Sequence, residues 1–159
     1  PLDQVDTVAT GMLASFNPKD GSEKARVEFA AIEHRLEQPQ QHMTCWDKTQ
    51  VPARLHYGSN PRVPQLLCLA DIGWRISTAD KLAHPAKKIA IGDHGYDNAA
   101  LVMQAIFVAH GPAFRVDAKV PAFPNVDVYP LMTHLLGLPT IPGDGDYNAV
   151  KDMLLPVAR

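Results

Sequence analysis

The sequence predicts an α/β fold in which short buried strands are covered by amphipathic helices. Short continuous apolar runs at 65–71 and 106–109 have the length and composition of buried strands. Residues 22–36 and 125–136 carry apolar side chains at helical spacing. The chain has 159 residues, the length of one ordinary domain, so we expect a single layered unit.

The N-terminal part is predicted to form a strand, a turn and a helix. β-branched and small residues within 5–16 indicate the strand, and the segment 17–21, Asn-Pro-Lys-Asp-Gly, indicates the turn. The helix should begin at Ser22, a favourable N-cap, and end before Pro39. Its buried face is predicted to consist of Ala25, Phe29, Ile32 and Leu36.

The middle of the chain is predicted to leave the sheet and return to it. Residues 40–64 are polar, aromatic and interrupted by prolines and a glycine, which indicates a surface excursion or a small cap. A buried strand over 65–71 should end at the carboxylate Asp71, and a second strand is expected at 73–76 after a turn. Residues 86–91 then lead into a glycine-rich loop.

The C-terminal part is predicted to hold a strand and two helices. The strand at 106–109 should end at the His-Gly-Pro segment 110–112. Asn125 or Asp127 can cap a helix that Gly137 terminates, and a short helix is expected near 148–155. The inner face of the longer helix is predicted to be Val128, Leu131, Met132, Leu135 and Leu136.

Composition and charge exclude several classes of protein. With 46% hydrophobic and 20% charged residues, the chain is typical of a globular protein. Its formal charge of −2 argues against binding to a nucleic-acid polymer. No apolar run approaches the roughly 20 residues that span a bilayer, so no membrane span is expected. The two cysteines, Cys45 and Cys68, are compatible either with one disulfide or with two buried thiols.

His94 has the most distinctive setting of the seven histidines. It is flanked by Gly92 and Gly95, which let the backbone turn tightly and approach an ion. Asp93 and Asp97 could accept a ring N–H, as metal-bound histidines usually require. The same loop could equally be a hydrogen-bonded turn in which an aspartate caps its own backbone.

The residues by themselves do not complete a metal or catalytic centre. A catalytic zinc needs three protein ligands, and no second cluster has ligand spacing, although His110 could fold back toward His94. No phosphate-binding glycine loop and no nucleophile elbow is present, so we name no catalytic and no cofactor-binding residue. Four histidines are expected in ordinary solvated roles: His34, His42, His84 and His134. Four aromatic side chains could line a slot for a ligand or simply seal the loops: Trp46, His56, Tyr57 and Trp74.

An ordered set of short segments resembles the nucleotide pyrophosphatase/phosphodiesterase family of the alkaline phosphatase superfamily. The first is Cys-Trp-Asp-Lys at 45–48, and the longest is Pro-Ala-Arg-Leu-His-Tyr-Gly-Ser-Asn-Pro-Arg-Val-Pro at 52–64. The set continues with segments at 69–74, 92–98, 106–114, 126–132 and 135–138. A sulfatase or phosphomutase relative shares the type of segment at 126–132, but the segment at 45–64 disfavours that assignment.

The resemblance implies a fold, a reaction and one site residue. The fold would be an alkaline-phosphatase-like layered sheet with covering helices, of which residues 1–159 form the C-terminal portion of a single catalytic domain with a loop-rich excursion around 40–64. The reaction would be metal-dependent hydrolysis of phosphodiester or pyrophosphate bonds, with two zinc ions and a threonine nucleophile. His94 matches the zinc-ligating histidine of the family's His-Gly-x-Asp-Asn segment, and Asp93 would support it.

The resemblance also implies that this chain is incomplete. The threonine nucleophile and the remaining metal ligands are expected upstream of Pro1, so the isolated chain should be inactive and its partner would be the N-terminal part of the same domain. The substrate would be a nucleotide or another phosphodiester. Exported members of the family make a periplasmic or secreted location the expectation. The alternative is a non-catalytic structural or binding fragment of the same fold.

Overall fold

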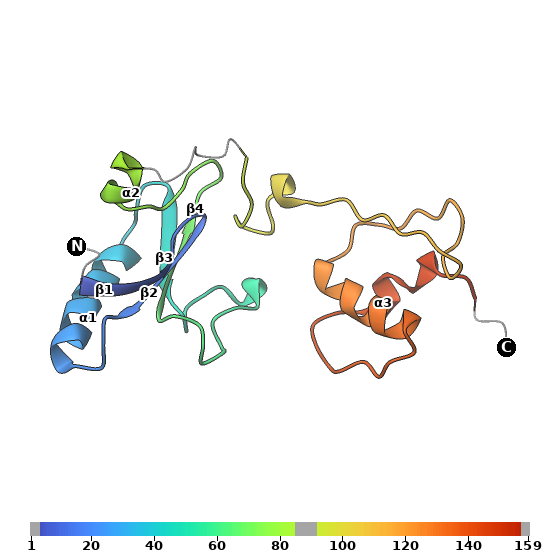
Figure 1. Ribbon diagram of the computed structural model, residues 1–159, viewed down its shortest axis with the longest axis horizontal. Helices are drawn as coiled ribbons and strands as arrows, with labels where there is room; N and C mark the ends of the chain where they lie inside the picture. The colour runs from blue at the N-terminus through green and yellow to red at the C-terminus, as the bar shows by residue number, and fades with distance from the viewer. Residues whose placement is uncertain (1–3, 85–91, 157–159) are drawn as a thin grey trace. The chain divides into compact units, whose positions relative to one another are not determined.

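The computed structural model describes residues 4–84 and 92–156 of the chain. They fall into two compact units, Pro1–Ala105 and Ile106–Arg159 (Figure 1). Strands and helices are both present, so the α/β class is confirmed. No helix among the described residues is long and apolar enough to cross a membrane.

The first unit is built on an antiparallel sheet with the strand order β1-β2-β4-β3. The strands are β1 (Val5–Ala9), β2 (Leu13–Pro18), β3 (Met43–Asp47) and β4 (Leu66–Ala70). Residues 5–16 were predicted as one strand, and the structure divides them between the paired strands β1 and β2. The chain reverses around Gly11, whose φ of 143° favours glycine.

Helix α1 (Glu23–Glu37) packs against β1, β2 and β3, as the sequence predicts. The Ser22 hydroxyl caps it by accepting a hydrogen bond from the Ala25 backbone N–H at 3.1 Å. Ala25 and Phe29 are buried, and Ile32 and Leu36 pack against the same core. The predicted inner face of this helix is therefore confirmed.

Strand β3 lies inside the segment 40–64, where the sequence predicts a surface excursion. The remainder of that segment is irregular apart from a short 3-10 helix at Ala53–Leu55. β3 pairs directly with β4, and Cys45 stands opposite Cys68 in the register. The two residues form a disulfide, which settles the choice that the sequence left open.

β4 confirms the predicted strand over 65–71, but the strand predicted at 73–76 is wrong. The chain turns there, because the Trp74 N–H bonds to the Asp71 carbonyl at 2.9 Å. Ile76 then makes only an isolated bridge to Gly11. Helix α2 (Ala79–Ala83) follows.

The second unit has its own small core of Leu131, Val150, Met153 and Leu154. Helix α3 (Val128–Leu135) supplies Leu131, and backbone hydrogen bonds join residues 113–115 to residues 153–155. Gly137 ends α3 with a φ of 63°, as predicted, and the N–H groups of Gly137 and Leu138 bond to the carbonyls of His134 and Thr133.

Four details of this unit differ from the sequence prediction. Residues 106–109 belong to no strand, and the predicted helix near 148–155 is a pair of 3-10 turns, Tyr147–Ala149 and Lys151–Met153. Asp127 precedes α3 without a capping side-chain bond. Met132 and Leu136, expected on the inner face of α3, are 50% and 64% exposed.

Replacing Phe29 with alanine tests whether α1 is docked on the sheet. Phe29 is 1% exposed, so Phe29→Ala should lower the free energy of unfolding by about 3–5 kcal/mol. Urea titration followed by circular dichroism measures the change. Val27, which lies on the same helix and is 62% exposed, provides the control, because Val27→Ala should change stability by less than about 0.5 kcal/mol. Equal effects of the two substitutions would contradict the packing.

Removing the disulfide tests the pairing of β3 with β4. The bond closes a loop between residues 23 positions apart, so the double variant Cys45→Ala/Cys68→Ala should be less stable by about 2–4 kcal/mol. The unfolding midpoint measures this loss. A reductant should shift the midpoint of the original protein in the same direction and leave that of the double variant unchanged; a reductant with no effect on the original protein would refute the bond.

Candidate functional site

The loop at 92–98 presents His94 on the surface of the first unit. His94 is exposed, and within the described residues its imidazole makes no hydrogen bond, ion pair or ring contact. Gly95 turns the chain with a φ of 98°, and a Cβ at that position would lie 3.8 Å from the Cβ of Met12. The loop therefore passes beside the start of β2, with its histidine side chain open to a ligand.

Asp97 anchors one end of this loop. Its carboxylate accepts two hydrogen bonds from the Arg54 guanidinium, one of them at 2.8 Å, and a further bond from the Ala99 backbone N–H at 2.9 Å. These bonds, that from Arg54 first, lower the pKa of Asp97 to about 2. The Arg54 side chain comes from the 3-10 helix 43 positions earlier in the chain.

Asp93 anchors the other side of His94. Its Oδ1 accepts a hydrogen bond from the His94 backbone N–H at 3.0 Å, and its Oδ2 lies 3.6 Å from Nη1 of Arg75. Asp93 and Asp97 were both predicted as acceptors for the ring N–H of His94. In the described structure neither carboxylate bonds to that ring. Each accepts a hydrogen bond from a backbone N–H and pairs with an arginine.

The loop can supply one imidazole ligand, and the described residues do not bring together three groups that could hold a metal ion. A zinc ion in a protein is bound by three or four side chains. An exposed, unpartnered imidazole on an anchored loop fits one of these ligands. The described donors therefore amount to one of the ligands that such a centre requires.

Of the other histidines that the sequence singled out in the first unit, His34 and His84 are exposed and make no described contact with His94. The approach of His110, which belongs to the second unit, stays a prediction. Trp74, a member of the predicted aromatic slot, stacks on His42 with ring centroids 3.6 Å apart, and Nδ1 of His42 lies 3.8 Å from Oδ2 of Asp71. His42 was predicted to be an ordinary loop histidine, and its stacking partner lies too far away in the sequence for a local pattern to predict.

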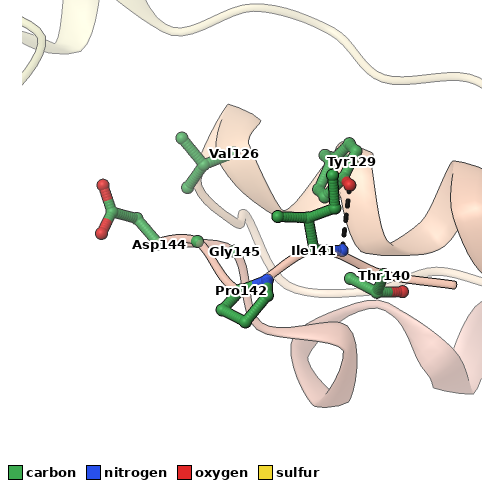
Figure 2. Close-up of a pocket in the computed structure, with 8 residues that line it drawn as sticks. Val126, Tyr129, Thr140, Ile141, Pro142, Asp144 and Gly145 are labelled. Atoms are coloured by element: carbon green, nitrogen blue, oxygen red, sulfur yellow. Dashed lines mark hydrogen bonds between the residues drawn. The ribbon is translucent and has the colours of Figure 1, made fainter.

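Described residues of the second unit line two surface pockets, and neither lining includes a residue predicted to bind metal. The first, of about 330 Å³, is lined by residues of α3 and of the loop 140–145, where the Ile141 N–H donates to the Tyr129 hydroxyl at 3.1 Å (Figure 2). Gly145 is required there, because an added Cβ would lie 2.4 Å from the Val126 carbonyl oxygen. The second, of about 580 Å³, includes Arg115, His134 and Lys151 in its lining. Neither pocket was predicted from the sequence.

Replacing Arg54 tests whether its hydrogen bonds lower the pKa of Asp97. In Arg54→Gln the pKa of Asp97 should rise from about 2 toward its ordinary value of 3.8, because its strongest hydrogen-bond donor is lost. The sign of the pH dependence follows: the contribution of the pair to stability is present above pH 3.8 and is lost as the pH falls toward 2. Carbon-detected NMR titration of the carboxylate measures the pKa. Arg62→Gln is the control, and an Asp97 that titrates identically in the original protein and in Arg54→Gln would contradict the pairing.

The comparisons with known proteins agree on one family. A sequence profile of the family described as type I phosphodiesterase/nucleotide pyrophosphatase matches residues 2–97. Human ectonucleotide pyrophosphatase/phosphodiesterase family member 5 is 36% identical over 142 residues, which are 89% of this chain and 28% of that protein. This chain therefore spans little more than a quarter of the length of that relative.

Solved structures agree with the sequence match. The structure of the human member 5 protein is similar with a TM-score of 0.82 and 32% identity, over 97% of this chain and 38% of that one. An inactive variant of the murine member 5 protein, in complex with AMP, has a TM-score of 0.80 and 33% identity, over 98% of this chain and 38% of that one. On these matches, the chain belongs to the type I phosphodiesterase/nucleotide pyrophosphatase family of the alkaline phosphatase superfamily.

Proposed function

We propose that the protein containing this chain is a zinc-dependent hydrolase of phosphodiester or pyrophosphate bonds, and that His94 is one of its zinc ligands. The proposal rests on how the loop holds and exposes the His94 side chain. Its imidazole is exposed and unpartnered in the described structure, while the aspartates on both sides of it are paired with arginines. A solvated surface histidine would need no such anchoring.

The residues of this chain would act by holding one ring in place. Gly95, with its φ of 98°, allows the turn of the loop, and the two arginine–aspartate pairs restrict its motion. An anchored ligand loses less conformational entropy when a metal binds. Zinc would bind a neutral nitrogen of the His94 ring. Two bound zinc ions would neutralise charge on the transferring phosphoryl group and lower the pKa of the nucleophile.

The rest of the site is proposed to come from polypeptide outside this chain. The described residues hold no group of three metal-ligating side chains, and the human relative is much longer than this chain. The nucleophilic threonine and the remaining ligands would therefore be supplied by the N-terminal part of the same catalytic domain. No catalytic residue is assigned within residues 1–159, and the isolated chain would not turn over substrate.

The proposed substrates are small nucleotides or other small phosphodiesters. Support comes from the murine relative, which was solved in complex with AMP. The formal charge of −2 agrees with a small ligand better than with a nucleic-acid polymer.

The alternative function is that of a non-catalytic structural or binding fragment. It is favoured by the same lack of a complete ligand set in the described residues. Zinc content and turnover of the intact protein discriminate between the two, because a structural fragment requires neither.

Replacing His94 tests the proposed ligand. In the intact protein, His94→Ala should lower both zinc stoichiometry and turnover of a p-nitrophenyl phosphodiester by orders of magnitude, while the circular dichroism spectrum stays unchanged. His34→Ala is the matched control, because His34 is also exposed and lies on helix α1. Full zinc content together with full turnover in His94→Ala would remove His94 from the site.

A further inference from the structure

The pocket of about 580 Å³ in the second unit concentrates basic side chains. Its lining includes Arg115, Lys151 and His134, together with one acidic residue, Asp152. The chain has a formal charge of −2, so this gathering of basic groups is a local feature. The volume lies within the range of about 300–1,000 Å³ that is typical of pockets for small molecules.

Neutral acceptors hold the two permanent cations of this pocket. Nη1 of Arg115 donates to the backbone carbonyl of Asp152 at 3.1 Å, and Nζ of Lys151 donates to Oδ1 of Asn148 at 2.9 Å. Within the described part of the chain, neither head group pairs with a carboxylate. The two bonds therefore position both charges without neutralising them.

Both head groups keep hydrogen-bond donors for a ligand. A guanidinium has several N–H groups in a planar fork, and an ammonium has several around one nitrogen. The described structure uses one of them on Arg115 and one on Lys151. Hydrogen bonds from such cations to a phosphate oxygen are among the strongest in proteins. The unused donors thus fit a small oxyanion.

His134, on helix α3, adds a third polar group to the lining. Its ring contacts that of Tyr147, with centroids 4.6 Å apart, and Tyr147 packs against the core of the unit. This contact holds the imidazole in the wall of the pocket, where a ring N–H can donate to an anion. Leu154, which is 8% exposed, contributes an apolar part of the same wall.

We propose that this pocket binds the phosphate group of a small ligand, with Arg115 and Lys151 as charged donors and His134 as a third donor. Inorganic phosphate and a phosphomonoester share this chemistry. The carboxylate of Asp152 repels further negative charge, which restricts the pocket to one small anion. The site adds to the proposed function and requires neither zinc nor turnover.

Titration of the intact protein with inorganic phosphate tests the pocket, with isotope-labelled histidine as the NMR reporter. At constant ionic strength, the ring signal of His134, assigned with His134→Gln, should shift and reach saturation at millimolar phosphate. His34, which is exposed on helix α1, is the internal control and should not respond. A His134 shift that stays linear in phosphate, or that His34 shares, would be a non-specific ion effect and would overturn the proposal.

Two substitutions test the charged donors. Arg115→Gln and Lys151→Gln should each weaken phosphate binding at least about tenfold, because each removes a charge-assisted hydrogen bond. Lys119→Gln is the matched control, since it removes a cation of the same unit that is not in the lining of the pocket. Circular dichroism checks that the three variants are folded. An equal loss of affinity in all three would contradict the assignment.

AMP and adenosine show which part of a ligand the pocket recognises. AMP should shift the His134 signal with saturation, whereas adenosine, which lacks the phosphate, should not. An affinity for AMP equal to that for inorganic phosphate would support a site for the phosphate group alone. Tighter binding of AMP would support the same site with an added contact to the organic part. A response to adenosine as strong as that to AMP would overturn the proposal.

The same titration of His94→Ala separates this inference from the proposed function. A zinc centre also binds phosphate, but the lining of this pocket does not include His94, so the His134 response should persist in the variant. Its loss would assign the anion to the zinc centre and overturn the inference. An inactive, zinc-free protein with a saturable His134 shift would refute the function alone. An active zinc protein without that shift would refute the phosphate pocket alone.

Discussion

The pairing of two arginines with the aspartates on either side of His94 is the constraint on which the candidate site depends. A loop with two glycines and an exposed histidine has few packing contacts to fix its path, and ordering it costs conformational entropy. Exposed ion pairs typically stabilise a protein by only about 0–1 kcal/mol, so these pairs contribute little to global stability. They act by positioning the loop. The two hydrogen bonds between the Arg54 guanidinium and the Asp97 carboxylate fix both the distance of the loop from Arg54 and its orientation.

The two arginines that contact the loop follow neighbouring strands of the sheet. Arg54 follows β3 and Arg75 follows β4, and these strands are antiparallel and joined by the Cys45–Cys68 disulfide. Because the strands are antiparallel, the chain leaves β3 at one end of the pair and β4 at the other. Arg54 and Arg75 lie in the segments that follow, and both contact the loop. The disulfide and the packing of α1 stabilise a scaffold from which the anchoring side chains project.

Local signals in the sequence predicted the elements that local chemistry determines. The cap at Ser22 with the apolar face of α1, the continuous apolar strand β4 and the glycine at the end of α3 were all confirmed. Long-range contacts were not predictable: the pairing of β3, the stacking of His42 on Trp74 and both arginine–aspartate pairs join residues without a common local pattern. The strand predicted at 106–109 is not found, because the apolar pattern predicts burial, whereas Ile106 and Val108 are 92% and 84% exposed in the described structure. The role of His94 as a metal ligand stays a prediction from resemblance.

The most direct test of this account is the zinc anomalous signal in a crystal structure of the intact protein. We expect a zinc ion about 2.0–2.1 Å from an imidazole nitrogen of His94, with its other ligands outside this chain. Zinc bound by a complete ligand set that leaves the His94 ring in solvent would contradict the account.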